Sequence, residues 1–240
     1  MKLVETFRRA RIIDASPVIR PGMPLFPGHP ALEIDATART HARDGYFLQT
    51  LFISEHTGAH ADAPAHAVAS MAAQTIDTIP VKRFVVPYLI IDLAPLRLTA
   101  GQLATGEDVR AAEQATGHSL ERGDAALINF GWELHYNEPD DWWTKNAPGL
   151  TEDACAYLVA QGIGLVGSDT ATCDIGMRDG AMVAAHGHQT YFLPNGIPIV
   201  EGLVGLESAP RRGVFVGAPL KVAGGSGAPL RALLISEEDQ

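Results

Sequence analysis

Three of the nine histidines in this 240-residue chain lie close to an aspartate in the segment 56–66, which reads HTGAHADAPAH. Two imidazole nitrogens and the carboxylate oxygen of this segment would form a ligand set that suits Zn²⁺ or Mn²⁺. A centre with three protein ligands keeps one position open for water, as catalytic metal centres do. Because the segment contains no cysteine, it does not fit a closed structural zinc site. The segment therefore predicts a catalytic metal centre.

The spacing of these residues predicts an extended but curved backbone. Counted from His56, the other three side chains lie 4, 6 and 10 residues further on, so an extended backbone sends all four to the same side. A helix would turn Asp62 about 240° away from His56, and Pro64 would interrupt it. A straight strand would separate His56 from His66 by about 33 Å. We therefore expect a bend, which Gly58 and Pro64 allow, and a concave cluster of the four side chains.

Short strands joined by tight turns are expected to hold this cluster. The chain contains 24 glycines and 16 prolines, which favours many short elements over a helical bundle. Apolar and β-branched runs predict strands near residues 11–14, 47–54, 85–92, 125–130, 163–167, 197–201, 213–217 and 230–235. Two helices are predicted, one at 105–117 with a capping box of Thr105 and Asp108, and one at 151–162 capped by Thr151.

Composition and charge argue against several classes of protein. The chain has 28 acidic against 18 basic residues and no large basic cluster, so we expect no nucleic-acid partner. The apolar runs are too short to cross a membrane, and the N-terminal sequence lacks the apolar stretch of an export signal. Two cysteines without a CxxC pair suit a reducing compartment, so a cytoplasmic protein is expected. A chain of this length buries about 70–75% of its unfolded surface, which predicts one domain over residues 1–240.

The segment 56–66 resembles the HxGTHxDxPxH signature of the metal-dependent cyclase family, which includes bacterial kynurenine formamidases and isatin hydrolases. Ala59 stands where the family has threonine. Further blocks that resemble the family lie at residues 14–16, 22–30, 124–132, 167–170 and 196–203. The resemblance implies an α/β fold, a single domain with a mixed, partly barrel-like sheet of the swivelling β/β/α type.

The resemblance also implies roles for individual residues. His56, His60 and Asp62 would hold a first metal ion, and His66 would be the catalytic residue that transfers a proton. Phe26 stands where formamidases of the family place a tryptophan against the aromatic substrate, so it is expected to bind substrate.

A second metal ion would share Asp62 and take Glu201 together with a histidine upstream of it. His188 lies 13 residues before Glu201, close to the separation in the family, and is the preferred ligand. His186 lies 15 residues before Glu201 and stays open as the alternative. The expected cofactor is therefore Zn²⁺ or Mn²⁺, with one or two ions per subunit.

The predicted reaction is hydrolysis of the carbon–nitrogen bond of a small-molecule amide, an aryl formamide or a lactam such as N-formylkynurenine or isatin. A bound dication lowers the pKa of its water to about 7, and the resulting hydroxide would attack the carbonyl. Two alternatives stay open: a cyclase or dehydratase acting on a polyketide-type or other small carbonyl substrate, and a metal-dependent ligand-binding protein without turnover. The family further implies a homodimer or homotetramer, in which the Pro-rich N-terminal segment reaches a neighbour's pocket.

Several other residues are interpreted without a direct part in the chemistry. Four histidines are expected to be ordinary surface or core residues: His29, His41, His118 and His135. Asp169 is expected to organise the loop after a strand. Three tryptophans are expected to supply a further wall of the site: Trp132, Trp142 and Trp143.

Overall fold

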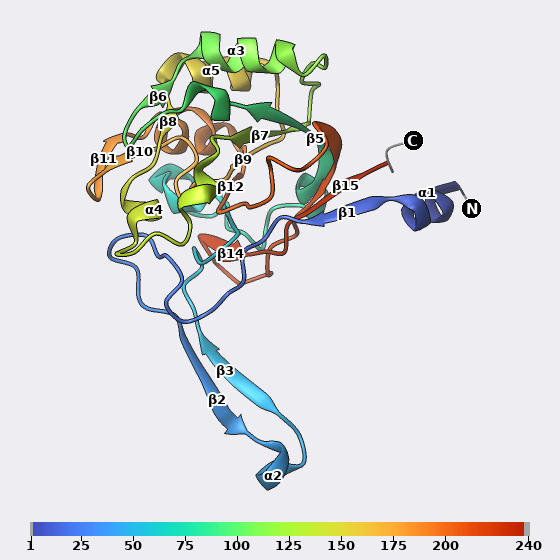
Figure 1. Cartoon of the computed structure of the whole chain (residues 1–240), viewed down its shortest axis with the longest axis vertical. Helices are drawn as coiled ribbons and strands as arrows, with labels where there is room; N and C mark the ends of the chain where they lie inside the picture. The colour runs from blue at the N-terminus through green and yellow to red at the C-terminus, as the bar shows by residue number, and fades with distance from the viewer. Residues whose placement is uncertain (1, 238–240) are drawn as a thin grey trace.

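The computed structural model of the chain describes residues 2–237, and its centre is a mixed sheet of nine strands (Figure 1). In spatial order these are β1 (Arg11–Asp14), β15 (Leu233–Ser236), β13 (Arg212–Val216), β5 (Val85–Asp92), β7 (Ala125–Asn129), β9 (Leu165–Ser168), β12 (Ile199–Glu201), β4 (His60–Asp62) and β14 (Gly227–Pro229). The strands β5, β7, β9 and β12 run parallel, and those on either side pair antiparallel. All residues of β7 are buried, as expected of a parallel strand covered on both faces.

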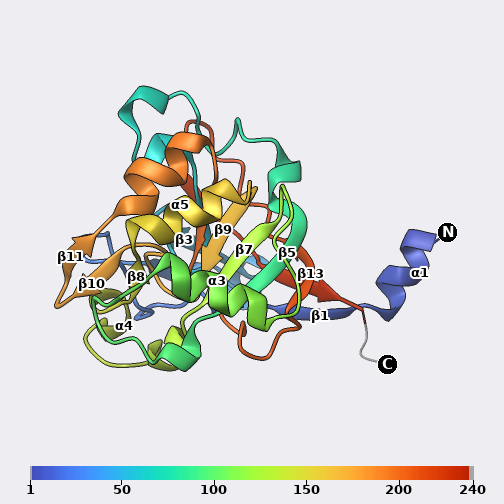
Figure 2. The ribbon, with the colours of Figure 1, turned by 90° about the horizontal axis from the view of Figure 1, so that it is seen from above.

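Alternate residues of β5 enter two different cores on the two faces of the sheet. Leu89 and Ile91 pack into a core that includes residues of the helices α3 (Gly106–Ala115) and α5 (Glu152–Ala160). The two helices lie side by side over the central strands, as Figure 2 shows from above. This helical layer leaves the opposite face of the sheet to form the second core.

The second core shows that the sheet is curled. It contains Tyr88 and Ile90 of β5, Leu234 of β15 near one edge and Ala228 of β14 at the other edge. In a flat sheet β15 and β14 would lie seven strand spacings of about 4.8 Å apart, roughly 34 Å, and could not share a core. The sheet therefore closes into a half-barrel, and the predicted single α/β domain with a mixed, partly barrel-like sheet is confirmed.

The two main helices begin where the sequence predicts, but only one has the predicted cap. The hydroxyl of Thr105 accepts a hydrogen bond from the Asp108 amide, and the Asp108 carboxylate accepts one from the Thr105 amide, so the capping box is confirmed. Thr151 stands just before α5, but its side chain does not cap the helix. The prediction of a side-chain cap by Thr151 is wrong because the hydroxyl is turned toward Asp153 Oδ1 and Ala104 O.

Each of the eight predicted strands is present, with ends displaced by at most three residues. The strand β2 (Glu33–Arg39) was not predicted. It pairs antiparallel with β3 (Leu48–Phe52) in a hairpin that projects from the body, with the short helix α2 (His41–Asp44) at its tip (Figure 1). Because β2 reads EIDATAR and is mostly exposed, it lacks the apolar pattern on which a sequence-based prediction depends.

The remaining helices and strands are short. They are α1 (Lys2–Arg9), β6 (Leu103–Ala104), α4 (Trp142–Lys145), β8 (Gly149–Leu150), β10 (Gly176–Arg178) and β11 (Ala181–Ala184). The strand β6 pairs with β8, and β10 pairs with β11. Within residues 2–237, no helix is both long enough and apolar enough to span a membrane.

Candidate active site

The short strand β4 carries two residues of the motif and lies between β12 and β14. His60 pairs with Glu201 of β12, so these two side chains leave the sheet next to each other on the same face. Ala61, which follows His60, is fully buried, and its small side chain lets β4 pack into the second core. The register of β4 against β12 thus joins the motif to a glutamate far away in the sequence.

The backbone bends on both sides of β4, as the spacing of the motif predicts. Gly58 has a φ of 65°, in the left-handed region, and turns the chain so that the ring centroids of His56 and His60 lie 5.1 Å apart. After β4, Pro64 begins a 3-10 helix that ends at His66, whose ring centroid lies 4.2 Å from that of His56. The expected concave cluster of side chains from the motif is therefore present.

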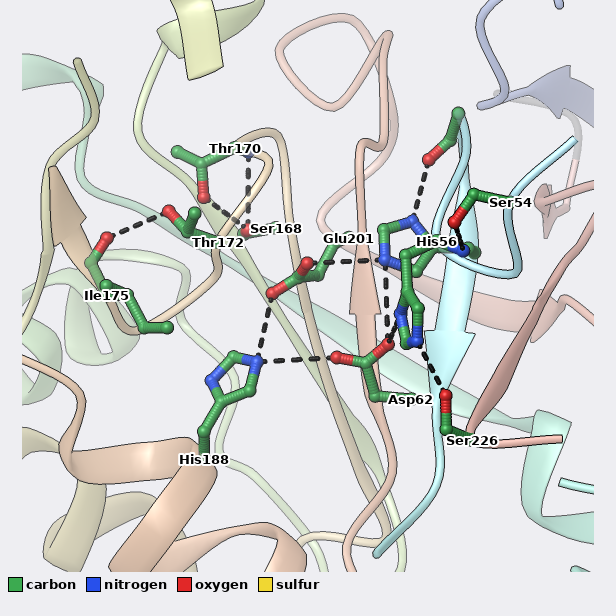
Figure 3. A network of polar contacts seen from close by, with 12 residues as sticks. Ser54, His56, Asp62, Ser168, Thr170, Thr172, Ile175, His188, Glu201 and Ser226 are labelled. Carbon is green, nitrogen blue, oxygen red and sulfur yellow. Dashed lines mark hydrogen bonds and ion pairs between the residues drawn. The ribbon is translucent and has the colours of Figure 1, made fainter. Parts of the chain in front are cut away.

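His188 joins the cluster from a π-helical turn and faces both Asp62 and Glu201 (Figure 3). Its Nε2 lies 3.3 Å from Asp62 Oδ2 and 3.4 Å from Glu201 Oε1. The Nε2 of His60 lies 3.5 Å from Asp62 Oδ1 and 3.4 Å from Glu201 Oε2. Each carboxylate thus turns one oxygen toward each of two imidazoles. Of the two histidines left open by the sequence, His188 and not His186 lies at these carboxylates.

The donor atoms of this cluster fit a divalent cation. Ligand atoms that lie about 2.0–2.2 Å from a tetrahedral ion are about 3.3–3.6 Å apart. The separations between imidazole and carboxylate atoms, 3.3–3.5 Å, match this value. Asp62 Oδ2 and Glu201 Oε1 are buried, and among the described residues their contacts are the ion-pair distances of 3.3 Å and 3.4 Å to Nε2 of His188. When Nε2 of His188 carries no proton, these buried carboxylate oxygens have no donor, which is costly, so a cation would supply the interaction that they need.

Within residues 2–237, two groups of three side chains have ligand atoms close enough together to share an ion. They are His56, Asp62 and His66, and His60, Asp62 and Glu201. Asp62 belongs to both groups and is almost completely buried. It therefore lies at the centre of the candidate metal site.

A hydrogen bond to the backbone fixes the orientation of the His60 ring. Its Nδ1 lies 2.9 Å from the carbonyl oxygen of Gly58. When Nδ1 carries the proton and donates it to that carbonyl, Nε2 is left with a lone pair that faces the carboxylates. This is the tautomer that a metal ligand at Nε2 requires.

His56 is held by side chains at both ring nitrogens. Its Nδ1 lies 2.7 Å from Asp62 Oδ1, and its Nε2 lies 2.9 Å from the hydroxyl oxygen of Ser226. The Ser226 hydroxyl in turn donates a hydrogen bond to Glu55. Sequence analysis did not find Ser226 or Glu55, because the two residues are far apart in the chain and belong to no recognisable motif.

A cavity of about 310 Å³ opens onto the cluster and is large enough for a small molecule. Phe26 lies in its wall, as expected for a residue that contacts substrate, and of the three tryptophans only Trp143 lines it. The Pro-rich N-terminal segment lines the cavity of its own chain through Met23 and Pro24, and its contact with a neighbour's pocket stays a prediction. The lining of the cavity therefore combines aromatic side chains with candidate metal ligands.

Comparison with known proteins assigns the chain to a family. Residues 13–175 match the family model described as putative cyclase. The chain belongs to the cyclase family. A kynurenine formamidase of Salinibacter ruber is 31% identical over 231 residues, which cover 95% of this chain and 99% of that protein. An isatin hydrolase of Roseibium aggregatum is 24% identical over 240 residues, covering 93% of this chain and 91% of that protein.

Solved structures agree with the assignment of this cyclase-family protein. Isatin hydrolase A from Ralstonia solanacearum superimposes with a TM-score of 0.86 at 27% identity, covering 98% of this chain and 96% of that one. An isatin hydrolase bound to the product analogue thioisatinate has a TM-score of 0.87 at 24% identity and shows the shared fold. The predicted family and the predicted enzyme class, an amide-cleaving hydrolase, are thereby confirmed.

In the site of this cyclase-family protein, the histidines and carboxylates shift each other's pKa values toward the charged forms. Burial lowers the pKa of His60, but the carboxylates of Glu201 and Asp62 outweigh burial and raise it to about 9. Burial likewise lowers the pKa of His188, but the carboxylate of Asp174 at its other ring nitrogen, together with those of Asp62 and Glu201, holds it well above the ordinary value. Burial raises the pKa of Asp62, but the neighbouring imidazoles bring it well below the ordinary value. Without a cation, His60 and His188 are therefore protonated at pH 7, and a cation has to displace these protons.

The affinity for Zn²⁺ or Mn²⁺ is expected to rise with pH up to about 9. Because the metal-free His60 has a pKa of about 9, each ion bound there displaces at least one proton, and affinity should increase by at least about tenfold per pH unit. In the metal-free protein, the raised pKa stabilises the fold below the ordinary histidine pKa of 6.5, and this contribution is lost as the pH rises through about 9. Competition with a chelator at several pH values measures the affinity, and a constant affinity would contradict a protonated His60.

Asp169 organises the loop after β9, as the sequence predicts. Its carboxylate accepts hydrogen bonds from the backbone amides of Phe130 at 2.8 Å, Trp132 at 2.5 Å and Glu133 at 3.2 Å. These bonds join the loop after β9 to the loop after β7. Asp169 therefore supports the fold near the cavity without contacting the candidate ligands.

His29 is a residue of the cavity that sequence analysis missed. It was interpreted as an ordinary residue, but it lines the cavity, and its ring centroid lies 5.3 Å from that of Phe26. Its Nδ1 is buried and has no hydrogen-bond partner among the described residues. The sequence feature that could have identified His29 is its position in the Pro-Gly-His-Pro turn, which directly follows Phe26.

Proposed function

We propose that this protein is a metal-dependent hydrolase that cleaves the carbon–nitrogen bond of an aryl formamide or a lactam. The observation that carries the proposal is the pair of buried carboxylates, Asp62 and Glu201, that each face His60 and His188, two histidines that line a cavity with aromatic residues in its wall. Relatives named kynurenine formamidase and isatin hydrolase support N-formylkynurenine and isatin as the first compounds to test.

The cavity suits a substrate with one flat apolar end and one polar end. Phe26 and Trp143 offer aromatic surface in its wall, and His60, His188 and Glu201 of the metal cluster line it as well. A substrate that packs its ring against these aromatic side chains directs its amide carbonyl toward the cluster.

When bound, a divalent cation supplies a water of lowered pKa and polarises the carbonyl. His56, His60, Asp62, His188 and Glu201 would hold it. Burial lowers the pKa of His66; the carboxylate of Asp62 opposes this shift, and the nearby imidazoles of His56 and His188 add to it. His66 is therefore neutral at pH 7 and can accept a proton on a ring nitrogen from the attacking water. It then delivers this proton to the departing nitrogen as the carbon–nitrogen bond breaks, so the products are an amine and a carboxylic acid, which releases its own proton to water and becomes a carboxylate.

The metal identity and number are part of the proposal. Nitrogen and oxygen ligands without thiolate suit Zn²⁺ or Mn²⁺. Asp62 and Glu201 each offer two oxygens that face different histidines, which supports up to two ions per subunit. Elemental analysis of the purified protein measures both the identity and the number of the bound ions.

A substrate panel tests the reaction. Purified protein is stripped with a chelator, reloaded with Zn²⁺ or Mn²⁺, and assayed against formanilides, N-formylkynurenine, isatin-like lactams, imides and lactones. We expect hydrolysis of a formanilide or a lactam that disappears in chelator and returns with the added ion. Loss of water from a substrate would identify a dehydratase or cyclase, and binding without turnover would identify a ligand-binding protein. Full turnover by the metal-free protein would refute the proposal.

We also propose that the protein forms a homodimer or homotetramer in the cytoplasm. The projecting hairpin of β2 and β3 supports the proposed oligomer, because it exposes three apolar side chains. Phe47, Leu51 and Phe52 expose 51%, 49% and 60% of their surface. Exposed apolar clusters of this kind are typical of protein interfaces. Two buried free cysteines, Cys155 and Cys173, support a reducing compartment.

Replacing Leu51 and Phe52 by aspartate is expected to dissociate the oligomer. The change places two charges on the apolar hairpin, and burying unpaired charges at an interface costs several kcal/mol. Light scattering after gel filtration measures the mass of the particle. An exposed apolar residue away from the hairpin, Leu134, provides the control, and Leu134→Asp should leave the mass unchanged. A wild-type protein that is fully active as a monomer would contradict the proposed assembly.

A further inference from the structure

Asp174 is a completely buried carboxylate to which the proposed chemistry gives no role. It lies in the loop after β9, and its backbone oxygen accepts a hydrogen bond from the Leu150 amide at 2.9 Å. Its side-chain Oδ1 lies 2.5 Å from Nδ1 of His188. This nitrogen belongs to the same ring whose Nε2 faces Asp62 and Glu201. The His188 ring is thus placed between Asp174 on one side and the cluster on the other.

The second oxygen of Asp174 holds the backbone that carries His188. Oδ2 accepts a hydrogen bond from the Gly187 amide at 2.6 Å and lies 3.4 Å from the His188 amide. These amides stand at the start of the π-helical turn Gly187–Tyr191, where no preceding helical turn provides acceptors. One carboxylate therefore fixes both the ring and the backbone of His188.

The approach of Asp174 depends on the absence of a side chain at Gly187. A Cβ atom at this position would lie 2.6 Å from Asp174 Cγ and 2.4 Å from Phe192 Cδ2. Such contacts are too short for carbon atoms, so any other residue would push the carboxylate or the Phe192 ring away. The local sequence is thus suited to this one carboxylate–imidazole contact.

We propose that Asp174 is a positioning residue that presents Nε2 of His188 to a metal ion. A neutral imidazole carries one proton, and a carboxylate that accepts it at Nδ1 leaves the lone pair on Nε2. His60 obtains the same tautomer from the carbonyl of Gly58, whereas His188 obtains it from a charged group that also makes the ring more basic. The inference rests on the proposed role of His188 as a metal ligand.

The variant Asp174→Asn tests this role. An asparagine keeps the shape of the aspartate side chain but replaces one acceptor oxygen with an NH₂ group. This group then faces either the protonated Nδ1 of His188 or the N–H of Gly187, so two hydrogen-bond donors oppose each other. We expect the affinity for Zn²⁺ or Mn²⁺, measured by competition with a chelator, to fall about 10- to 100-fold. The matched control is Asp169→Asn, which alters another buried carboxylate in the same loop that binds backbone amides and touches no histidine of the cluster. The control should lower the thermal stability and leave the affinity of the folded protein unchanged.

A measurement on the wild-type protein keeps the test independent of how well the variant folds. In the Zn²⁺-loaded protein, ¹⁵N-resolved NMR of the histidine rings should show a proton on Nδ1 of His188. A proton on Nε2 of this ring would overturn the inference. So would an Asp174→Asn protein that binds metal as tightly as the wild type.

The variant His188→Ala separates this inference from the proposed function. If His188→Ala weakens metal binding and Asp174→Asn does not, the ligand role stands and the positioning role of Asp174 is wrong. If His188→Ala binds metal with unchanged affinity and number of ions, the proposed ligand set fails and the positioning role fails with it.

Discussion

Replacing Asp62 with alanine is expected to abolish metal binding and turnover together. Asp62 faces His56, His60 and His188, and it belongs to both groups of side chains that could hold an ion. Loss of a residue that merely supports a metal ligand costs about 10- to 100-fold in affinity, so loss of this central carboxylate should cost more than about 100-fold. Turnover should fall below about 1% of the wild-type value, because the cation supplies the attacking water.

The matched control for this experiment is Asp92→Ala. Asp92 is a carboxylate of β5 that makes an ion pair with Arg211 at 2.6 Å and does not line the cavity. We expect this variant to lose some stability but to keep its metal content and turnover. Elemental analysis, chelator competition and the rate with the best substrate of the panel distinguish the two variants. An Asp62→Ala protein with wild-type metal content would show that the ion binds elsewhere.

The part of the site that could be predicted from the sequence is the part encoded by local geometry. The even spacing within residues 56–66 predicts that the side chains converge, and Gly58 and Pro64 predict the bends. The structure has both bends, at the positive φ of Gly58 and at the 3-10 helix that begins with Pro64. Such predictions succeed because a few neighbouring residues determine the backbone directions.

The part that could not be predicted depends on contacts between distant segments. Ser226 reaches His56 because β14 pairs with β4, and Asp174 reaches His188 because the loop after β9 packs against a π-helical turn. Neither contact leaves a periodic pattern in the sequence, since each depends on the closure of the sheet. Glu201 and His188 were found through the family resemblance, whose spacing already contains this long-range information.

The hairpin shows the same limit for the fold. The strand β3 was predicted from its apolar residues, but its partner β2 is polar and mostly exposed, and so it carries no burial pattern. Its pairing follows from the hairpin connection and not from a core of its own. The sequence therefore predicted the strands that build the two cores better than the strand that serves the projecting hairpin.

Replacing His66 with alanine is expected to stop turnover while leaving the metal in place. His66 can share an ion with His56 and Asp62, but its imidazole lies beside that of His56, at a centroid distance of 4.2 Å, and the pair of carboxylates faces His60 and His188. The five proposed ligands therefore hold the metal without His66. Loss of a proton-transferring side chain typically costs about 10²- to 10⁴-fold in rate.

The wild-type rate should also fall in acid as His66 becomes protonated, at a pH below the ordinary histidine pKa of 6.5, because burial and the nearby imidazoles lower its pKa. The matched control, His118→Ala, removes an exposed histidine that does not line the cavity and should keep full activity. A His66→Ala protein that turns over every substrate of the parent at the parent's rate would exclude proton transfer by His66. Catalysis would then have to come from the metal ion without this histidine.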